Sequence, residues 1–424
     1  MKPFPLVVLP FPLVVLALGF LSAQCAAAEG FVIRGATVHT ASARGTLKNT
    51  DVLVRGGVIV AIGADASAPN ATVIDAKGKE LTPGLFGGLT DIGLEEIAAE
   101  SATVDSTLNQ KSPAWEQQWR PELDVTMAYN PRSIIVPIER IEGVTWTVLA
   151  PNAGDSIIAG QGSAVMLDGR YDAALPGSRS LFVQMGAAGA RESGGTRAAE
   201  YMLLEQAIHE AHAPGPIGQG ALLHAAGRDA LNRYLMGGRV VFQVDRASDI
   251  REVVAFAERN GIKPVILGGD EAWLVAKELA KANVPVILNP LNDLPMDFDR
   301  LASSLENAAR LQRAGVRIAF SNGDTAQARL VRQLAGNAVA HGLPWESALA
   351  AITSTPADIF GLGATHGRIA VGQAADLVLW SGDPLELSTL AEKVWIAGRP
   401  VEMKSRQTEL RDRYVEKVNV HQAR

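Results

Sequence analysis

The sequence predicts an α/β protein: a (β/α)8 TIM-like barrel with a small β-sandwich domain formed by both ends of the chain. Residues 30–80 and 366–402 are rich in Val, Ile and Thr and are broken by Gly and Asn, which is typical of short strands. The middle of the chain alternates apolar strands with amphipathic helices, which indicates a parallel sheet covered on both faces. With 424 residues, the chain is long enough for a barrel and an accessory domain.

Residues 1–28 are predicted to be a signal peptide. Lys2 precedes an apolar run over residues 5–21, and an A-x-A pattern stands just before Glu29. We therefore expect an exported protein, periplasmic or extracellular, with no membrane contact after cleavage; a retained N-terminal anchor is the alternative. The single cysteine, Cys25, falls in this segment, so the mature chain would have no thiolate ligand, no Cys nucleophile and no disulfide.

The overall composition bounds the class of protein. Apolar residues make up 47% of the chain and charged residues 20%, which is the balance of a folded protein and not of a disordered one. The net charge is −6 and no block of Lys or Arg occurs, so nucleic acid is not expected as a partner.

The barrel is expected to occupy residues 81–365, between the two segments 29–80 and 366–402 that would build the β-sandwich domain. Its expected strands cover residues 144–150, 239–244, 263–268, 284–288 and 316–320, and its expected helices cover about 131–143, 249–261, 270–283 and 297–314. A doubly wound open sheet is the alternative fold, but no G-x-G-x-x-G motif follows the first strand.

Residues 403–424 are predicted to form a charged C-terminal helix. Leu410, Tyr414 and Val418 follow one another at intervals of four residues and would form a narrow apolar stripe. We expect this stripe to pack on the chain's own barrel; contact with a second subunit is the alternative.

Three stretches resemble the amidohydrolase superfamily, in particular its imidazolonepropionase-like branch. They are "GKELTPGLFGG" (78–88), "DSIIAGQGSAVMLDG" (155–169) and "STPADIFGLGATHGRIAVGQAADLVLWSGDPLE" (354–386), and the likeness extends over nearly all of residues 30–402. The resemblance implies one or two divalent metals, typically zinc, at the C-terminal mouth of the barrel. Such metals lower the pKa of a bound water so that it can attack a C–N bond.

The positions where the resemblance places metal ligands hold other residues here. The His-x-His of the first strand falls on Leu89 and Asp91, and the fourth-strand lysine falls near Met166. The two later histidines fall on Gln243 and Gly268. We therefore predict that the ordinary binuclear site is absent and that the protein has no metal cofactor.

The acid after the last strand is assigned to Asp324, with Asn322 and Gly323 as the other candidates. Asp324 and Asp91 are thus the candidate catalytic residues. A further carboxylate, Asp245, could join them, but we expect it to start a loop before a helix and to pair with Arg246 or Arg251.

The histidines provide a test that does not depend on any family. The seven are His39, His209, His212, His224, His341, His366 and His421, and none lies near the expected strand ends. His209 and His212 form "HEAH", but their spacing is i, i+3 and not the i, i+4 of the zinc-protease motif, so a polar helix face is expected.

Three functional hypotheses follow. In the first, the protein is non-catalytic and binds a small-molecule ligand, or acts as a companion subunit in a homo-oligomer or in a complex with an active relative. In the second, it is an active hydrolase of a small amide or cyclic imide that uses Asp91 and Asp324. In the third, it is a structural scaffold whose barrel mouth is filled by side chains such as Leu89 and Met166.

Overall fold

The computed structural model describes residues 30–422 except 65, 67–69, 110–118, 214, 216–217, 219 and 324. The predicted signal peptide and Asp324 therefore lie outside the described residues. Within the described part of the chain, no helix has the length and apolar character needed to cross a membrane.

The two ends of the chain meet in one sheet. Over the described residues it has eight strands: β1 (Phe31–His39), β2 (Thr46–Arg55), β3 (Val58–Ile62), β4 (Thr72–Asp75), β5 (Glu80–Pro83), β15 (Leu377–Trp380), β16 (Ala391–Ile396) and β17 (Arg399–Pro400). The order is β17-β16-β15-β5-β1-β2-β3, with β4 also paired to β1. Antiparallel pairing of Leu377 with Pro83 joins the late strands to the early ones.

The expected β-sandwich is replaced by a single sheet that curls back on itself. Val58 in the edge strand β3 forms a β-bridge to Ala374, three residues before β15 begins. The sheet therefore encloses its own apolar core, which includes Ile33, Val52 and Leu377. A second facing sheet is not needed to bury these side chains.

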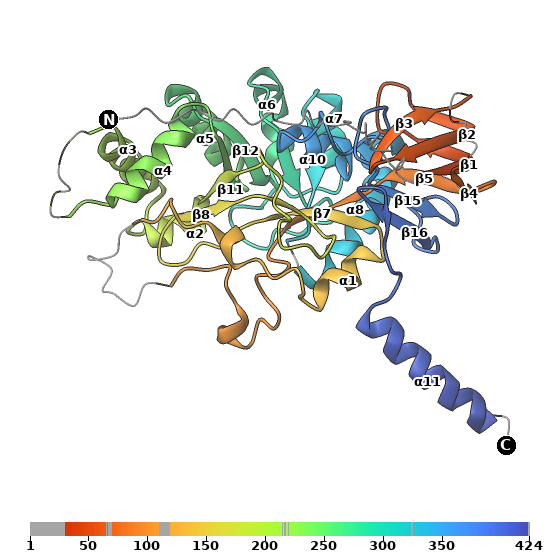
Figure 1. The fold of residues 1–424 in the computed structure, drawn as a ribbon. Coiled ribbons are helices and arrows are strands. Elements are labelled where there is room, and N and C mark those ends of the chain that lie inside the picture. Colours follow the sequence, from red (N-terminus) through yellow and green to blue (C-terminus); the bar gives the residue numbers. More distant parts are fainter. Residues whose placement is uncertain are drawn as a thin grey trace, which may run out of the picture.

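The middle of the chain forms a TIM-barrel-like α/β unit with mixed strand directions (Figure 1). Its described strands are β6 (Leu85–Thr90), β7 (Val144–Leu149), β8 (Ile158–Gly162), β9 (Ala164–Met166), β10 (Ser180–Gln184), β11 (Arg239–Val244), β12 (Lys263–Gly268), β13 (Val286–Leu288) and β14 (Ile318–Phe320). Strands β10 to β14 are parallel neighbours, and β6 pairs parallel with β7.

One segment departs from the expected eight parallel strands. Strands β8 and β9 are separated only by Ser163; β8 runs antiparallel to β10, and β9 runs antiparallel to β7. Over the described residues the barrel strands form a six-stranded sheet, β14-β13-β12-β11-β10-β8, and a three-stranded sheet, β6-β7-β9, and the segment 158–166 contributes a strand to each. Because its direction is reversed, its end at Met166 does not lie where a parallel strand would end.

The helices that follow the strands are α1 (Ile135–Arg140), α2 (Gly186–Glu192), α3 (Arg197–His212), α4 (Ala225–Leu235), α5 (Ala247–Arg259), α6 (Ala276–Lys281), α7 (Asn307–Arg313), α8 (Val331–Ala340), α9 (Trp345–Ala351) and α10 (Ser354–Ile359). Short 3-10 turns are η1 (Ser101–Thr103), η3 (Val125–Ala128), η4 (Ala272–Val275) and η5 (Thr325–Leu330). Helix α5 buries Ile250, Val253 and Ala257, as its apolar periodicity predicts.

Two predicted helices begin later than expected. Asn130 Oδ1 accepts a hydrogen bond from Arg132 N at 2.9 Å, which closes a side-chain turn, and α1 starts only at Ile135. The helix expected from residue 297 starts at Asn307, because the preceding residues form a loop that Glu271 Oε1 holds through Ala302 N at 3.0 Å.

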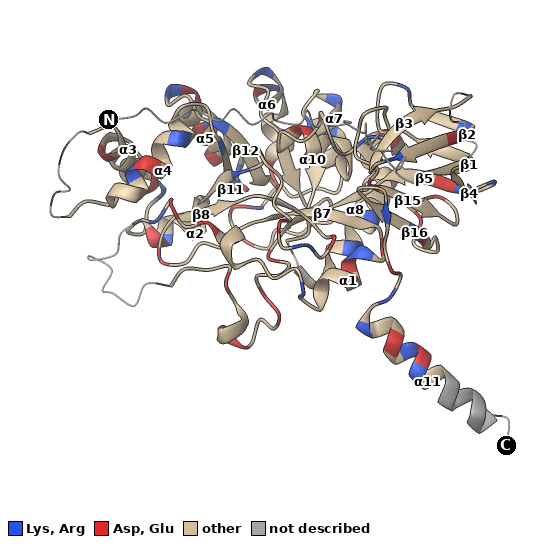
Figure 2. Ribbon diagram, in the orientation of Figure 1, with Lys and Arg blue, Asp and Glu red and all other residues tan. Residues whose placement is uncertain are grey.

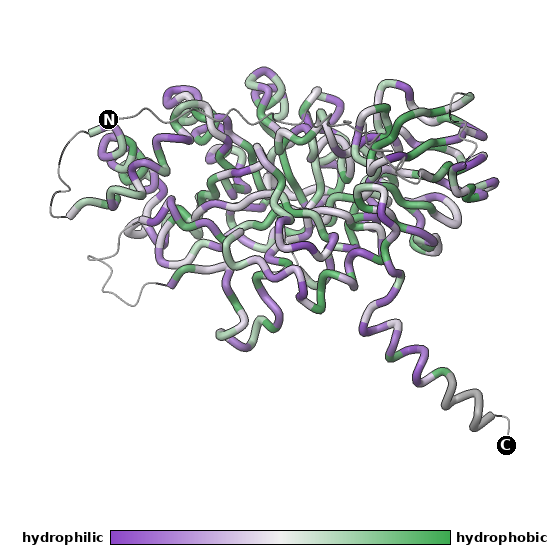
Figure 3. The backbone as a smooth tube through the Cα atoms, viewed as in Figure 1, coloured by the Kyte–Doolittle hydropathy of each residue, from purple (hydrophilic) through white to green (hydrophobic). Residues whose placement is uncertain are grey.

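The C-terminal helix α11 (Arg406–Gln422) projects away from the body (Figure 1), so the prediction that it packs on its own barrel is wrong. Leu410 is 37% exposed and Tyr414 is 58% exposed. Charged residues of both signs cover its described part (Figure 2), and most of this part is hydrophilic (Figure 3).

Arg332 on α8 joins the barrel to the segment after β15. Its buried guanidinium donates hydrogen bonds to the carbonyl oxygens of Pro384, Glu386 and Thr389, at 2.7, 2.8 and 2.9 Å, and stacks over the Trp380 ring at 4.5 Å. These three carbonyl groups belong to an irregular segment, so the guanidinium supplies partners that no strand provides.

Replacing Arg332 by Met should therefore lower the free energy of unfolding by about 3 kcal/mol, because it leaves carbonyl groups without partners. Urea unfolding measures the loss. Arg313→Met is the matched control, since Arg313 is exposed and bonds only to its own helix; its expected change is within about 0.5 kcal/mol. Equal effects of the two variants would contradict the role of Arg332.

Glu139 holds η5 against α1. Its buried carboxylate accepts hydrogen bonds from Arg329 N and, at 3.1 Å, from Arg329 Nη1. Burial raises the pKa of Glu139 to about 7, and the contacts with Arg329 oppose this rise. A carboxyl whose pKa is raised on folding stabilises the fold at pH values below its unfolded pKa, and this contribution is lost as the pH rises through 7.

The stability advantage of the wild type over Glu139→Gln should accordingly shrink between pH 5 and pH 8, by about 2 kcal/mol. Urea unfolding at the two pH values measures it, with the exposed Glu306→Gln as control. An advantage that grows with pH would show that the ion pair with Arg329 outweighs burial.

Candidate functional site at the barrel mouth

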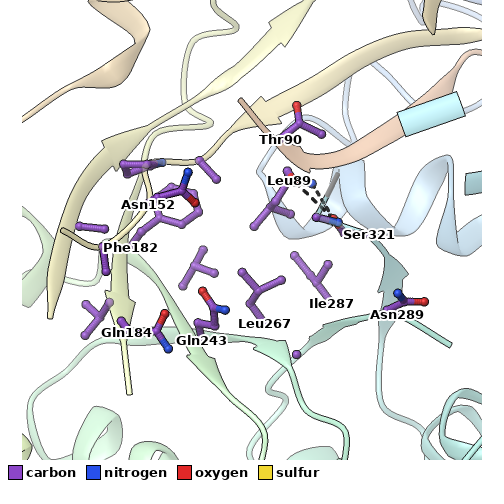
Figure 4. A pocket seen from close by; sticks show the side chains of 18 of the residues that line it. Leu89, Thr90, Asn152, Phe182, Gln184, Gln243, Leu267, Ile287, Asn289 and Ser321 are labelled. Carbon is purple, nitrogen blue, oxygen red and sulfur yellow. Dashed lines mark hydrogen bonds between the residues drawn. The ribbon is translucent and has the colours of Figure 1, made fainter. Parts of the chain in front are cut away.

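A cavity of about 380 Å³ lies at the C-terminal ends of the barrel strands (Figure 4). Residues within or just after each parallel strand from β6 to β14 line it, as expected for a barrel of this type. The strand-end residues around it are Thr90, Asn152, Gln184, Gln243, Gly268, Asn289 and Ser321.

The floor of the cavity is apolar. Leu89, Phe182, Val241 and Ile287 line it and belong to the same buried core. Leu89 is held there through its backbone: its N–H donates to Ser321 Oγ at 3.0 Å, and this hydroxyl donates to the Leu89 carbonyl at 3.4 Å. The dashed lines in Figure 4 mark these bonds between β6 and the end of β14.

Carboxamides dominate the wall above this floor. Gln184 and Gln243 are register partners on β10 and β11, and Asn152 and Asn289 follow β7 and β13 (Figure 4). Gln184 Nε2 donates to Met185 O, and Asn289 Oδ1 accepts from Leu291 N. The Gln243 side chain is exposed to the cavity and has no hydrogen-bond partner among the described residues, so its donor and acceptor are available to a ligand.

One side of the cavity carries an ion-pair cluster. Asp245 Oδ2 lies 3.0 Å from Arg300 Nη2, and Arg300 also lies 3.5 Å from the buried Asp270. Asn292 Nδ2 donates to both oxygens of Asp270, at 3.0 and 3.1 Å. Burial raises the pKa of Asp245 to about 6, and the Asp270 carboxylate adds to this rise while Arg300 opposes it.

The predicted partner of Asp245 was wrong. Arg246 pairs with Asp249 instead, and Asp245 reaches Arg300 on the loop between β13 and α7. This contact joins residues that are 55 positions apart in the sequence, so local spacing could not reveal it.

Asp91 lies at the rim of the same cavity. Its Oδ2 accepts hydrogen bonds from Ser106 Oγ at 3.2 Å and from Asn152 Nδ2 at 3.5 Å. Asn322 and Gly323 also line the cavity, so the segment predicted to hold the last acid reaches the mouth. The position of Asp324 itself lies outside the described residues.

The structure brings Leu89, Gln243 and Gly268 together around the cavity, but not Met166. Met166 ends β9 and lies in the buried core, so its assignment as the fourth-strand position is corrected. Gln184 on β10 lines the cavity instead. Gln184 was not among the predicted site residues, although it ends an apolar run followed by a glycine-rich helix start.

The histidines lie elsewhere. None of the described ones lines the cavity. In "HEAH", Glu210 accepts hydrogen bonds from the backbone N–H groups of Leu222 and Leu223 at 3.1 and 3.0 Å, so that motif fixes a loop. His224 precedes α4 as its N-cap.

These residues do not fit a binuclear metal centre. Zinc requires imidazole, thiolate or carboxylate donors. Leu89 supplies no lone pair, and Gln243 offers only a neutral amide. At Gly268 a Cβ atom would lie 2.3 Å from Asp245 Oδ1, and φ is +90°, so no histidine is accommodated there. In the part of the chain that is described, no group of three or more His, Cys, Asp or Glu could hold a metal ion.

Comparison with known proteins identifies the family. An imidazolonepropionase from Chromobacterium violaceum is 28% identical over 381 residues, which cover 81% of this chain and 88% of that protein. The amidohydrolase tasK from Hapsidospora irregularis is 45% identical, but over only 58 residues, or 14% of this chain and 6% of that protein. The predicted resemblance is confirmed.

A solved amidohydrolase from Thermotoga maritima has the same fold. Its TM-score is 0.74 at 24% identity, and the match covers 88% of this chain and all of that one. Residues 191–406, about half of the chain, match the amidohydrolase family. The chain therefore belongs to the amidohydrolase family.

Proposed function

We propose that this chain binds a small polar molecule at the barrel mouth and does so without the binuclear metal centre implied by its family resemblance. The observation that carries the proposal is the set Leu89, Gln243 and Gly268 at the expected ligand positions, with Leu89 fixed under Ser321. In this proposal the protein is a non-catalytic binding protein or the companion subunit of an active relative.

The cavity supports ligand binding over a purely structural role. A scaffold with a filled mouth would leave no space above Leu89, whereas about 380 Å³ is present and is lined by amides. A concave site with an apolar floor and a few polar groups is the usual form of a small-molecule site. The amide of Gln243, which has no partner among the described residues, favours a ligand that both donates and accepts hydrogen bonds.

The second candidate function is hydrolysis of a small amide or cyclic imide with Asp91 and Asp324. It is favoured by family membership and by the name of the imidazolonepropionase relative. It requires turnover that Asp324→Asn abolishes. A broad panel of amides and cyclic imides, with and without added Zn²⁺, Mn²⁺ or Mg²⁺, separates the two functions, since the binding proposal predicts no turnover.

A thermal-shift screen with neutral amides, cyclic imides and polyols tests the proposed site. A ligand at one hundred times its Kd should stabilise the fold by about 2.7 kcal/mol. Gln243→Leu should weaken its binding at least tenfold, because a buried ligand group loses its partner. Gln206→Leu, on the exposed surface of α3, is the matched control. A ligand whose affinity is unchanged in Gln243→Leu binds elsewhere.

We also infer that the protein acts after export, on the basis of the N-terminal sequence pattern. Expression of the full chain in a bacterial host should give a periplasmic or secreted product that starts at Glu29. N-terminal sequencing or intact mass measures this. A product that keeps residues 1–28 and remains with the membrane would instead support the alternative, in which residues 1–28 are a retained N-terminal anchor.

A further inference from the structure

The loop between β13 and α7, residues 289–306, presents an apolar surface to solvent. Four of its side chains are largely exposed: Leu294 at 61%, Met296 at 74%, Phe298 at 85% and Leu301 at 61%. Single exposed apolar residues are ordinary on a protein surface, but four within eight positions of one loop make this loop a candidate interaction site.

This loop is fixed from its inner side. Arg300 pairs with Asp245, and Ala302 O accepts a hydrogen bond from Trp273 Nε1 at 2.8 Å. Asp299 is buried and accepts from Ala187 N at 2.8 Å. The apolar side chains therefore face outward on a backbone that is held in place, so they do not result from a poorly packed loop.

Its exposed charges are acidic. Asp293 and Asp297 alternate with the apolar side chains, and residues 289–299 contain no Lys or Arg. The next cation, Arg300, lies within ion-pair distance of Asp245, Asp270 and also Asp297, so Asp293 is the exposed acidic residue of this segment that Arg300 does not reach. A partner for this surface should therefore be apolar with a basic margin.

Helix α11 of the same sequence has this chemistry. At 3.6 residues per turn, Arg406 and Arg413 fall within about 60° of Leu410, whereas Glu409 and Asp412 fall about 100° or more away. The face that carries Leu410 and Tyr414 is thus basic as well as apolar. Most of the stability of an amphipathic helix in a protein comes from the packing of its apolar face, so this face of α11 gains from being covered.

Within one molecule neither surface covers the other. Phe298 and Tyr414 are both exposed, and α11 projects away from the body (Figure 1). If the apolar faces of two α11 helices paired, the arginines beside Leu410 on one helix would lie near those on the other. If two loops paired, Asp293 and Asp297 of one copy would lie near the same residues of the other. Like charges oppose both arrangements, which leaves the pairing of the helix with the loop.

We propose that α11 of one copy docks on the loop 289–306 of a second copy, and that the exchange is reciprocal in a two-fold dimer. Leu410 and Tyr414 pack against Leu294, Met296 and Phe298, and the basic helix margin meets the acidic residues of the loop. Because each copy gives its helix and receives the other's, the dimer leaves no helix or loop open to a third copy, and the helix–loop contact occurs twice. The partner's helix then lies beside the cavity, because Arg300 and Asn292 of this loop line its wall.

Sedimentation velocity of the full chain over a concentration series tests the proposal. The wild type should dimerise, and its Kd should rise with salt because part of the contact is ionic. The loop variant Met296→Glu/Phe298→Glu and the helix variant Leu410→Glu/Tyr414→Glu should each raise the Kd at least tenfold. Met236→Glu, at an equally exposed position elsewhere, should not.

A mixing experiment identifies which surfaces meet. The loop variant keeps an intact helix and the helix variant keeps an intact loop, so an equimolar mixture should regain association through one complete contact. Asp293→Lys provides a second loop variant that leaves the apolar side chains in place, and thermal unfolding verifies that each variant is folded. A monomeric wild type, a dimer that survives the helix variant, or no recovery on mixing would overturn the proposal.

Discussion

The site depends on the close approach of Ser321 to the backbone of Gly88 and Leu89. Gly88 has φ of +93°, and a Cβ atom there would lie 2.7 Å from Ser321 Oγ, so the first barrel strand can pass this hydroxyl only as glycine. The hydroxyl then bonds to the Leu89 backbone and fixes its side chain in the core. The position that would carry an imidazole in a metal-binding relative thereby becomes part of the hydrophobic floor.

The residues at the other expected ligand positions, Gln243 and Gly268, are consistent with that hydrophobic floor. Gln243, the penultimate residue of β11, is a neutral amide that lines the cavity with Val241 and Leu267, and Gly268 has no room for a side chain because Asp245 occupies the space. Asp245 is itself held by Arg300 and buried enough to raise its pKa. Asp245, Asp270 and Arg300 are therefore committed to an ion-pair cluster, whereas the Gln243 amide has no hydrogen-bond partner among the described residues. This distribution favours recognition of a neutral, hydrogen-bonding molecule over coordination of a cation.

Much of this could be predicted from the sequence, because periodicity and strand composition are local. The strands at 239–244 and 263–268 and the buried face of α5 follow from apolar spacing. Strand direction does not, so the reversed segment 158–166 displaced Met166 from the mouth. Contacts between residues far apart in the sequence cannot be predicted from local patterns either. For this reason the single curled sheet, in place of a sandwich, and the contact between Asp245 and Arg300 were not predicted. The sequence did identify Leu89, Gln243 and Gly268, because each lies at or next to the last residue of a strand.

The most direct test of the central claim is the metal content of the purified chain. The protein would be incubated with excess Zn²⁺, passed through gel filtration and measured by elemental analysis, with a metal-binding amidohydrolase treated in parallel. Our account predicts well below one zinc per chain, because Leu89, Gln243 and Gly268 offer no imidazole or carboxylate. Two tightly held zinc ions per chain would contradict it.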